Sequence, residues 1–445
     1  MNSSAVFNLT FAAMRVLILI TLLSTTVQAS DNDYVALKRW LTSEAAAPAD
    51  GIAPGHYGRQ QLAEFARYIP PGYLPEFDFD DLSLDIEARG HYPAHQSFQA
   101  ASARFAGQAR IGSDGTLQNY AAGQPFSDAD IEAASADSAG YMVAWNHVHR
   151  WENFGFVAPQ TTISFIRAGA TASKRDNGLV GGGVVERELS MSYRRTYLSQ
   201  LAPLAEQDYR VKLRGEHNLL FKERIEILAP FDVAGTTIIL ERPLDQSAGD
   251  LVNSYLPTER RVRRLSAKER ADSWMGTNWT LDDFGGYAGL VMDNTWSYIG
   301  RKVVPYVINT EHELSITHGP LSVIPRDRWQ LRPCYVVEAV PRWEGHPYGR
   351  RVLFIDAETY SIALTLIFDR QDRLYKVVNG TYQHSQHGPD ADASLTTARM
   401  RSSIVINLLE RTANVARVIK PTDYSAPRFS QLDRIFSVAD LNSGR

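Results

Sequence analysis

The feature that most constrains the fold is an alternation of apolar and polar residues that begins near Tyr193 and continues toward the C-terminus. Its clearest instance is YSIALTLIF, residues 360–368, because a period of two residues is typical of a β-strand with one apolar face. The apolar positions of this strand are Tyr360, Ile362, Leu364, Leu366 and Phe368. Similar patterns occur in TTIILER, RRVRRL, WSYIGRKVVPYVI, PCYVVEAVPRW, RRVLFIDA and LYKVVNGTY. Turn residues separate them, so the sequence predicts many short, half-buried antiparallel strands.

A run of short strands with few helices predicts a mainly β fold of the α+β class, built on one extensive and strongly curved antiparallel sheet. Such a sheet covers its apolar face with helices, with a second sheet or with a ligand. One segment, SIVINLLERTANVARVI at residues 403–419, fits either a single helix or two strands around a turn.

The beginning of the chain has the pattern of a secretory signal peptide. The apolar run VLILITLL, residues 16–23, follows Arg15 and precedes small residues at Val27 and Ala29. This order is typical of a signal peptide, and the run is too short to span a bilayer. We expect residues 1–29 to be removed and the mature protein to be periplasmic. We also expect it to lack a lipid anchor, since no cysteine stands at the predicted mature N-terminus.

Composition limits the class of protein further. Cys334 is the only cysteine, so an intramolecular disulfide is excluded and the chain depends on its own core. About 415 mature residues are enough for one large or two to three ordinary domains. The net charge of −4 favours neither nucleic acid nor an anionic membrane surface as a partner.

Residues 30–137 are predicted to form an irregular segment of short helices separated by Pro and Gly clusters, followed by the main domain at 138–445. Asp114 and Gly115 stand between two short alternating runs, which predicts a hairpin. Ser127, followed by acidic residues and helix formers, predicts the start of a long helix.

The stretch SWMGTNWTLDDFGGY, residues 273–287, could be a catalytic centre, a ligand cradle or a tight turn. Catalysis would require different environments for Asp282 and Asp283, or a metal ion. Neighbouring strand residues point to opposite faces, so the two carboxylates do not readily share one substrate atom. The simpler interpretation is that Thr280 begins a helical turn in which Asp283 is the acidic member of a capping box.

Two further motifs contain histidine. His384 and His387 have a spacing compatible with a metal site, but their loop sequence offers no third ligand nearby. The stretch WNHVHRW, residues 145–151, places His147 and Arg150 on a predicted helix with two tryptophans. Ordinary helix packing explains this pattern, with the Arg150 side chain extending to solvent.

The sequence contains no motif for a catalytic nucleophile. No GxSxG elbow is present, and Cys334 lies in an apolar strand where a buried, inert thiol is usual. The sequence therefore predicts no catalytic residue, no metal site, no cofactor and no enzymatic activity.

One predicted strand is strongly basic. It contains Arg260, Arg261, Arg263 and Arg264. Either these arginines lie on an edge or outer-face strand, or they form a docking surface for an acidic partner.

Eight stretches of the chain, in order, resemble the domain of unknown function 1329 family of secreted proteins from Gram-negative bacteria. They are NYAAGQPF, AGYMVAWNHVHRW, VKLRGEHNLLFKE, APFDVAGTTIILER, YLPTERRVRRLS, MGTNWTLDDFGGY, WSYIGRK and YVVEAVPR…HPYGRRVLFIDAETY, and they lie within residues 108–418. That family is similar to the outer-membrane lipoprotein-sorting (LolA-like) proteins, in which RRVRRL and GTNWTLDDF have counterparts. The resemblance implies a curved half-barrel with helices across its concave face. It also implies that residues 403–419 form a strand, a turn and a strand.

The resemblance further implies a periplasmic carrier of a lipid or another hydrophobic ligand. Such a carrier is expected to work with an inner-membrane permease of the resistance-nodulation-division (RND) type and with outer-membrane components. The predicted cavity or rim residues are Trp279, Phe284, Tyr298, Tyr335, Val337, Tyr360, Ile362, Leu364, Leu366 and Phe368. For each of them an ordinary packed core is the alternative.

Two other functions stay open from the sequence. The protein could be an envelope adaptor or stress-sensing module that binds a protein segment through the arginine-rich strand. It could instead be a lipid hydrolase, in which the histidine motif or the Asp pair converges with a metal or a nucleophile.

Overall fold

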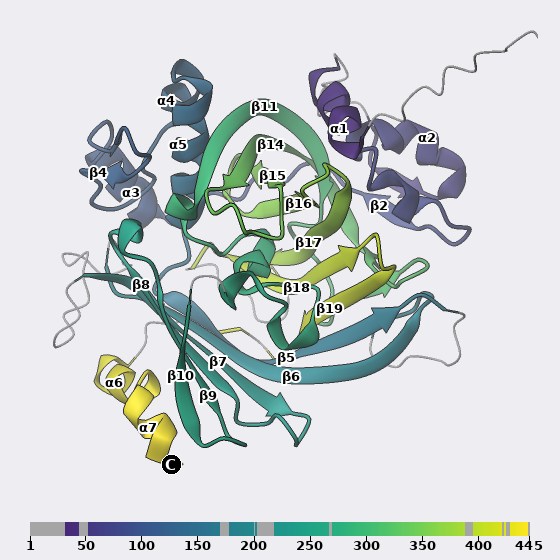
Figure 1. Ribbon diagram of the computed structural model, residues 1–445. Coiled ribbons are helices and arrows are strands. Elements are labelled where there is room, and N and C mark those ends of the chain that lie inside the picture. Colours follow the sequence, from purple (N-terminus) through teal and green to yellow (C-terminus); the bar gives the residue numbers. More distant parts are fainter. Residues whose placement is uncertain are drawn as a thin grey trace, which may run out of the picture. The chain divides into compact units, whose positions relative to one another are not determined.

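A large curved sheet dominates the part of the chain that the structure describes (Figure 1). The computed structural model describes residues 32–43, 52–169, 178–199, 201–202, 218–266, 269–387, 395–420, 422–423 and 428–443. The predicted signal peptide, residues 1–29, lies outside the described residues.

Fifteen strands of the described residues make up this sheet. In sheet order they are β1 (Gly55–Tyr57), β2 (Leu84–Ile86), β14 (Arg328–Pro341), β15 (Arg350–Asp356), β16 (Ile362–Phe368), β17 (Leu374–His384), β18 (Ala398–Asn407), β19 (Thr412–Val418), β5 (Gly155–Arg167), β6 (Val184–Tyr197), β7 (Leu219–Ala229), β8 (Thr237–Pro243), β9 (Leu251–Leu256) and β10 (Arg261–Leu265), with β11 (Asn294–Tyr306) paired to β14. The β2–β14 pair is parallel, and the other strand pairs in this sheet are antiparallel. The predicted mainly β fold with one large curved sheet is therefore confirmed.

Two short hairpins and a small number of helices complete the described structure. The hairpins are β3 (Arg110–Ile111) with β4 (Leu117–Gln118), and β12 (Thr317–His318) with β13 (Ile324–Pro325). The α-helices are α1 (Asp33–Thr42), α2 (Leu62–Phe65), α3 (Gln96–Arg104), α4 (Asp128–Ala133), α5 (Ala136–Val148), α6 (Leu432–Ile435) and α7 (Val438–Ser443). The 3-10 turns are η1 (Arg59–Gln61), η2 (Ala66–Tyr68), η3 (Leu74–Phe77), η4 (Gln246–Ala248), η5 (Glu269–Ala271), η6 (Trp274–Gly276), η7 (Leu281–Gly286), η8 (Val291–Asp293) and η9 (Phe429–Gln431).

The N-terminal elements pack in the same compact unit as the sheet. This unit comprises residues 32–445, and β1 and β2 are strands of the large sheet itself. The boundary predicted between residues 137 and 138 therefore does not coincide with a break in packing. The hairpin predicted around Asp114 and Gly115 is present as β3 and β4.

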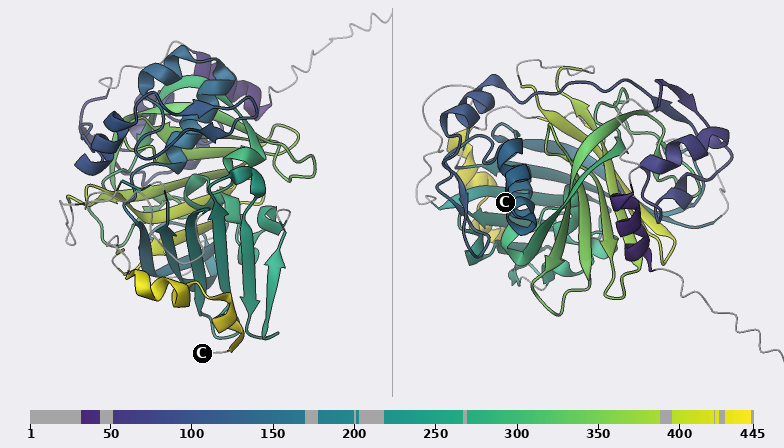
Figure 2. Two further views of the ribbon diagram at one scale, coloured as in Figure 1. Left: turned by 90° about the vertical axis from the view of Figure 1, so that its left-hand side faces the viewer. Right: turned by 90° about the horizontal axis from the view of Figure 1, so that it is seen from above.

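The sheet separates two apolar cores. The first core includes Phe65, Leu84, Val304, Val336, Phe354 and Ile404. The second core includes Trp145, Ile163, Leu189, Val337, Leu353 and Val405. Helix α5 contributes to the second core and lies alongside β11 (Figure 2). The central strands are thus buried on both faces, and each supplies alternate side chains to each core.

The long helix predicted from Ser127 is two helices. The Ser127 hydroxyl does cap the first of them, since it accepts a hydrogen bond from the Asp130 amide at 3.2 Å. Helix α4 ends before Ala134, whose backbone is extended, and Ser135 caps α5. A second Ser cap inside a run of helix formers is the signal that marks this break.

The strand at residues 360–368 differs from its prediction in two ways. All seven residues of β16 are buried, so it is a central strand and not a half-buried one. Its pairing with β15 also shifts by one residue between Ile362 and Leu364. This irregularity reverses the alternation, so Tyr360 and Ile362 belong to the second core while Leu364, Leu366 and Phe368 belong to the first.

The ambiguous segment at residues 403–419 forms parts of β18 and β19 with a turn between them, as the family resemblance implies. The strands predicted from the other alternating stretches are also present.

Candidate ligand-binding cavity

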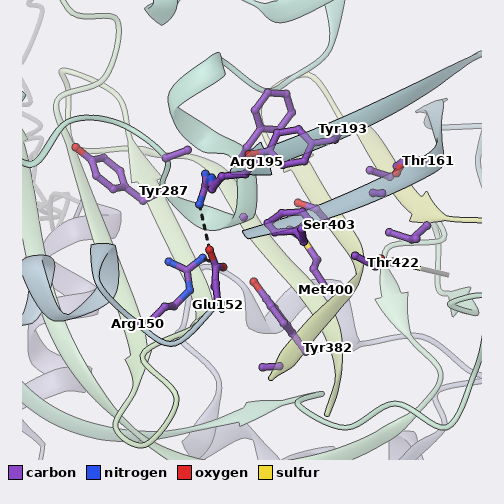
Figure 3. A pocket seen from close by; sticks show the side chains of 18 of the residues that line it. Arg150, Glu152, Thr161, Tyr193, Arg195, Tyr287, Tyr382, Met400, Ser403 and Thr422 are labelled. Carbon is purple, nitrogen blue, oxygen red and sulfur yellow. Dashed lines mark hydrogen bonds and ion pairs between the residues drawn. The ribbon is translucent and has the colours of Figure 1, made fainter. Parts of the chain in front are cut away.

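A cavity lies on the second-core side of the sheet, between strands β5 to β8, strands β17 to β19 and the turns around η7 (Figure 3). It encloses about 1180 Å³ of empty space when the part open to solvent is counted. About 120 Å³ of this is available to the centre of a water molecule. That is room for several water molecules or for part of a small organic ligand.

The wall is mainly aromatic and aliphatic, with a small number of charged groups. The lining residues are His147, Val148, Arg150, Glu152, Phe156, Ala158, Thr161, Met191, Tyr193, Arg195, Tyr197, Phe221, Arg242, Trp279, Phe284, Gly285, Tyr287, Ala288, Gly289, Tyr382, Ala398, Met400, Ser402, Ser403, Ala416, Val418 and Thr422. Walls of this kind, apolar with few polar groups, are typical of sites for hydrophobic ligands.

Strand β6 supplies the most regular part of the wall. Met191, Tyr193, Arg195 and Tyr197 are every second residue and all face the cavity. A strand has a side-chain period of two, so this spacing follows directly from the extended backbone. The alternation in MSYRRTY was a signal available in the sequence, and the cavity prediction did not include these residues.

A buried ion-pair cluster faces the cavity. The Glu152 carboxylate pairs with Arg150 and with Arg195, the latter at 3.3 Å, and accepts a hydrogen bond from the Tyr197 hydroxyl at 2.9 Å. Arg195 also pairs with Glu223 at 2.6 Å. The sequence predicts that Arg150 extends to solvent from a helix, and this prediction is wrong. Its ion pair with Glu152 holds the Arg150 side chain in the cavity wall. Two arginines and two glutamates compensate each other within the cluster.

The environment keeps these groups charged and a neighbouring histidine neutral. Burial by itself raises the pKa of Glu152, but the nearby Arg150 and Arg195 charges outweigh it and hold the pKa below its ordinary value. Burial lowers the pKa of His147 to about 3, and its Nδ1 lies 2.8 Å from the Tyr360 carbonyl oxygen. His147 is consequently neutral at neutral pH.

Asp282 and Asp283, the two adjacent acids of the segment 273–287, form ion pairs within the fold. Asp282 pairs with Arg270, and Asp283 pairs with Arg351. Arg270 in turn lies 2.8 Å from Asp250. Asp250 also accepts two hydrogen bonds from Arg242, at 3.0 and 2.8 Å, and Arg242 reaches the cavity wall. These bonds join the turns around η7 to strand β8.

Asp283 is fully buried and has four neighbours that favour its charge or orient it. The Asp283 carboxylate pairs with Arg351 at 3.0 Å and accepts a hydrogen bond from the Tyr348 hydroxyl at 2.7 Å. It also accepts a hydrogen bond from the Thr280 backbone amide at 2.9 Å. This last bond is the one that the acidic residue of the predicted capping box makes. Burial raises the pKa of Asp283, but the charges of Arg351 and Lys376 reverse this and lower it. The carboxylates are thus committed to ion pairs within the fold.

The predicted ligand-contact residues are distributed over different parts of the molecule. Trp279 and Phe284 line the cavity, and their ring centroids are 6.3 Å apart. Outside this wall, the other predicted residues belong to the two cores: Tyr335, Val337, Tyr360 and Ile362 lie in the second core, Tyr298 packs against that core, and Leu364, Leu366 and Phe368 lie in the first core. Tyr360 also lines a second cavity. A ligand-binding role stays a prediction for Trp279, Phe284 and Tyr360.

The other candidates are also not brought together. His384 is buried and His387 is exposed, with ring centroids 6.4 Å apart. Cys334 is fully buried, and burial raises the pKa of its thiol well above the ordinary value, as expected for an inert thiol. Within the described ranges, no group of three or more His, Cys, Asp or Glu residues could hold a metal ion.

Three arginines of the arginine-rich segment, Arg261, Arg263 and Arg264, are on the last strand of the sheet order, β10, and Arg260 lies in the turn before it. Arg260, Arg261, Arg263 and Arg264 are all exposed, and Arg263 pairs with Glu269 at 3.1 Å. No helix in the described part of the chain is long and apolar enough to cross a membrane.

Comparison with known proteins gives relatives whose roles are largely undefined. "Uncharacterized protein PA3922" of Pseudomonas aeruginosa is 24% identical over 343 residues, which is 74% of this chain. The chain spans 65% of the length of that curated relative.

Solved structures with similarity to this chain share low sequence identity with it. One is a DUF1329 family protein from Desulfovibrio piger (16% identity, 69% of this chain and 100% of the other, TM-score 0.47). Another is a putative outer membrane lipoprotein-sorting protein domain from Vibrio parahaemolyticus (14% identity, 67% and 97%, TM-score 0.44). A third is the LolA superfamily protein NE2245 from Nitrosomonas europaea (13% identity, 69% and 100%, TM-score 0.38). The model of the family described as "Protein of unknown function (DUF1329)" matches residues 79–441, and the chain belongs to that family.

Proposed function

We propose that the protein is a periplasmic carrier that binds a lipid or another hydrophobic ligand in the cavity described above. The observation that carries the proposal is the aromatic and aliphatic wall, formed on β6 by every second residue and closed by the turns around η7. Each methylene that the cavity removes from water contributes about 0.8 kcal/mol before the costs of association, so the affinity rises with the length of chain that the cavity holds. Tight binding therefore needs no catalytic group.

In this proposal the curved sheet acts as a half-barrel. Helix α5 and the turns of residues 269–293 cover its concave face, and the ligand enters and leaves beside them. The carrier receives its ligand from, or delivers it to, an RND-type permease of the inner membrane and components of the outer membrane. Release requires a partner that offers a more favourable site.

The first test is native mass spectrometry combined with lipid extraction, on protein purified from the periplasm that produces it. We expect a co-purifying species of defined mass that leaves only under organic denaturation. A protein that is empty and also fails to take up fluorescent fatty acids contradicts the proposal.

A substitution that fills the cavity provides the second test. Met400 projects into the cavity in Figure 3, and Met400→Trp adds a large ring there. We expect ligand affinity to fall by about tenfold or more, which is a loss of about 1.4 kcal/mol. Leu409→Trp is the matched control, because Leu409 is 48% exposed in the turn between β18 and β19. Equal affinity in the two variants would show that the ligand binds elsewhere.

A protein-binding adaptor is the second candidate, and it is favoured by the exposed arginines of β10. A strand at the end of a sheet offers unpaired backbone groups to an extended peptide, and the arginines would select an acidic one. Binding of this kind should weaken steeply with salt, since exposed charges are screened. Replacement of Arg261 and Arg264 by Gln should reduce peptide binding while leaving ligand uptake unchanged.

A further inference from the structure

A second cavity adjoins the first, and the two share part of their walls. The second cavity encloses about 960 Å³, counted with its opening to solvent. Arg150, Glu152, Tyr382 and Ala398 line both cavities. Arg150 and Glu152 also line a third, smaller cavity of about 320 Å³. The Arg150–Glu152 ion pair therefore stands where the cavities meet.

The exposed wall of the second cavity is more polar than that of the first. Gln124, Asn146, Ser361, His384 and Thr396 all contribute polar groups to its wall. Two polar atoms of this wall, His384 Nδ1 and Thr396 Oγ1, are buried without a hydrogen-bond partner among the described residues. The first wall also contains such atoms, Trp279 Nε1, Ser403 Oγ and Thr422 Oγ1, so the polarity of the whole wall, and not these atoms alone, distinguishes the second cavity. Buried polar atoms in folded proteins are nearly always paired, so a cavity with two unpaired ones can accept a partner from outside the chain.

The unpaired groups of the second cavity are uncharged. Burial lowers the pKa of His384 to about 4, so its ring is neutral at neutral pH. A neutral imidazole nitrogen and a hydroxyl can each take part in one hydrogen bond with a hydroxyl or an amide. These are the groups that an uncharged polar ligand would meet.

The charged groups of both cavities are already compensated. Arg150 pairs with Glu152, and Arg195 pairs with Glu152 and Glu223. In the first cavity Arg242 pairs with Asp250 at 2.8 Å, and in the second Glu358 pairs with Arg332 at 2.8 Å. An anionic ligand would have to compete with a carboxylate for every one of these arginines, which is costly in a buried site.

We infer that the ligand is an amphiphile whose polar end is uncharged, with its apolar part in the first cavity and its hydroxyl or amide end in the second. The polar end hydrogen-bonds to His384 Nδ1 and Thr396 Oγ1, and the Arg150–Glu152 pair lies beside the point where the two parts join. This inference rests on the proposed carrier function and adds the class of ligand to it.

The test compares two probes with the same chain length by isothermal titration calorimetry, both below the concentrations at which they form micelles. 1-Monolauroylglycerol has an uncharged head, and dodecanesulfonate is ionised at all working pH values. We expect the glyceride to bind at least about tenfold more tightly, since each arginine among the described lining residues is already paired with a carboxylate. We expect Thr396→Val to weaken glyceride binding about fivefold, the effect of one lost hydrogen bond, and to leave sulfonate binding unchanged.

Thr317→Val is the matched control. Thr317 also has a buried hydroxyl without a hydrogen-bond partner among the described residues, and it lines neither cavity. The same isosteric change there should leave both affinities unaltered, and urea unfolding of both variants checks that the fold is retained.

Other outcomes separate this inference from the proposed function. Equal or tighter binding of the sulfonate overturns the inference and leaves the carrier function intact. A larger loss of glyceride binding in Thr422→Val than in Thr396→Val would put the polar end in the first cavity and also overturn it, because Thr422 lines that cavity alone. If the wild-type protein binds neither probe and no lipid co-purifies with it, both the inference and the carrier function are wrong.

Discussion

Asp283→Asn is expected to lower the free energy of unfolding by about 3–5 kcal/mol, the cost of removing one partner from a buried ion pair. The side chains of Asp283 and Arg351 are 0% and 1% exposed, so solvent cannot replace the lost carboxylate charge. The substitution also weakens the hydrogen bonds from Tyr348 and from the Thr280 amide that hold η7 against the sheet. Urea unfolding followed by tryptophan fluorescence measures the change.

Asp272→Asn is the control for this variant, because Asp272 is an exposed residue in the same segment. Its effect should lie within about 0.5 kcal/mol, as for most surface substitutions. Similar stabilities for the two variants would mean that the Asp283–Arg351 pair contributes little to the folded state.

The pH dependence of stability follows from the same ion pair. The pKa of Asp283 is lowered in the folded protein, so the unfolded chain binds its proton more readily. The stabilisation is therefore complete above the unfolded value, near pH 4, and is lost as the pH falls through the folded value. Wild-type protein should lose stability below about pH 4 more steeply than Asp283→Asn, which has no carboxyl group to titrate at this position.

Glu152→Gln is expected to have an effect of similar size on stability and an additional effect on ligand choice. The Glu152 side chain is 9% exposed and compensates both Arg150 and Arg195, so its neutralisation should cost about 3–5 kcal/mol. It also leaves one uncompensated positive charge at the junction of the cavities. Dodecanesulfonate should consequently bind the variant about tenfold more tightly than it binds the wild type, because the sulfonate can replace the missing carboxylate.

Glu132→Gln makes the same chemical change outside the cavity walls. Glu132 pairs with Arg301 at 2.9 Å, and the two side chains are 50% and 37% exposed, so we expect a loss below about 1 kcal/mol and no change in ligand preference. An unchanged sulfonate affinity in a folded Glu152→Gln variant would contradict the charge balance described for the junction.

Much of the sheet could be predicted from the sequence because its strands carry local signals. A period of two residues marks the strands, and Asp114-Gly115 marks the hairpin of β3 and β4. The irregular pairing between β15 and β16 could not be predicted, since nothing in YSIALTLIF indicates an extra residue at Ala363. That one residue moves Leu364, Leu366 and Phe368 to the other core.

The cavity was predicted less well, for a different physical reason. Trp279 and Phe284 reach it, and they come from a segment rich in aromatic residues. Arg150 and Glu152 come from the turn after α5, and their pairing with Arg195 on β6 depends on how distant elements pack. Alternation identifies the two faces of a strand, but it does not tell which face meets a cavity and which meets a packed core.

The two sides of the cavity are built differently, and this affects how quickly a ligand can enter. One side consists of strands β5 to β8 and β17 to β19. The other consists of the segment from Trp279 to Gly289, which contains η7, together with the end of α5 and the turn after it. Backbone amides in the paired strands should exchange with deuterium only on global unfolding, while those of residues 274–289 should exchange through local opening. Ligand uptake should then have the same rate and the same temperature dependence as this local opening. Saturation with ligand should slow deuterium exchange in residues 274–289 far more than in the strands.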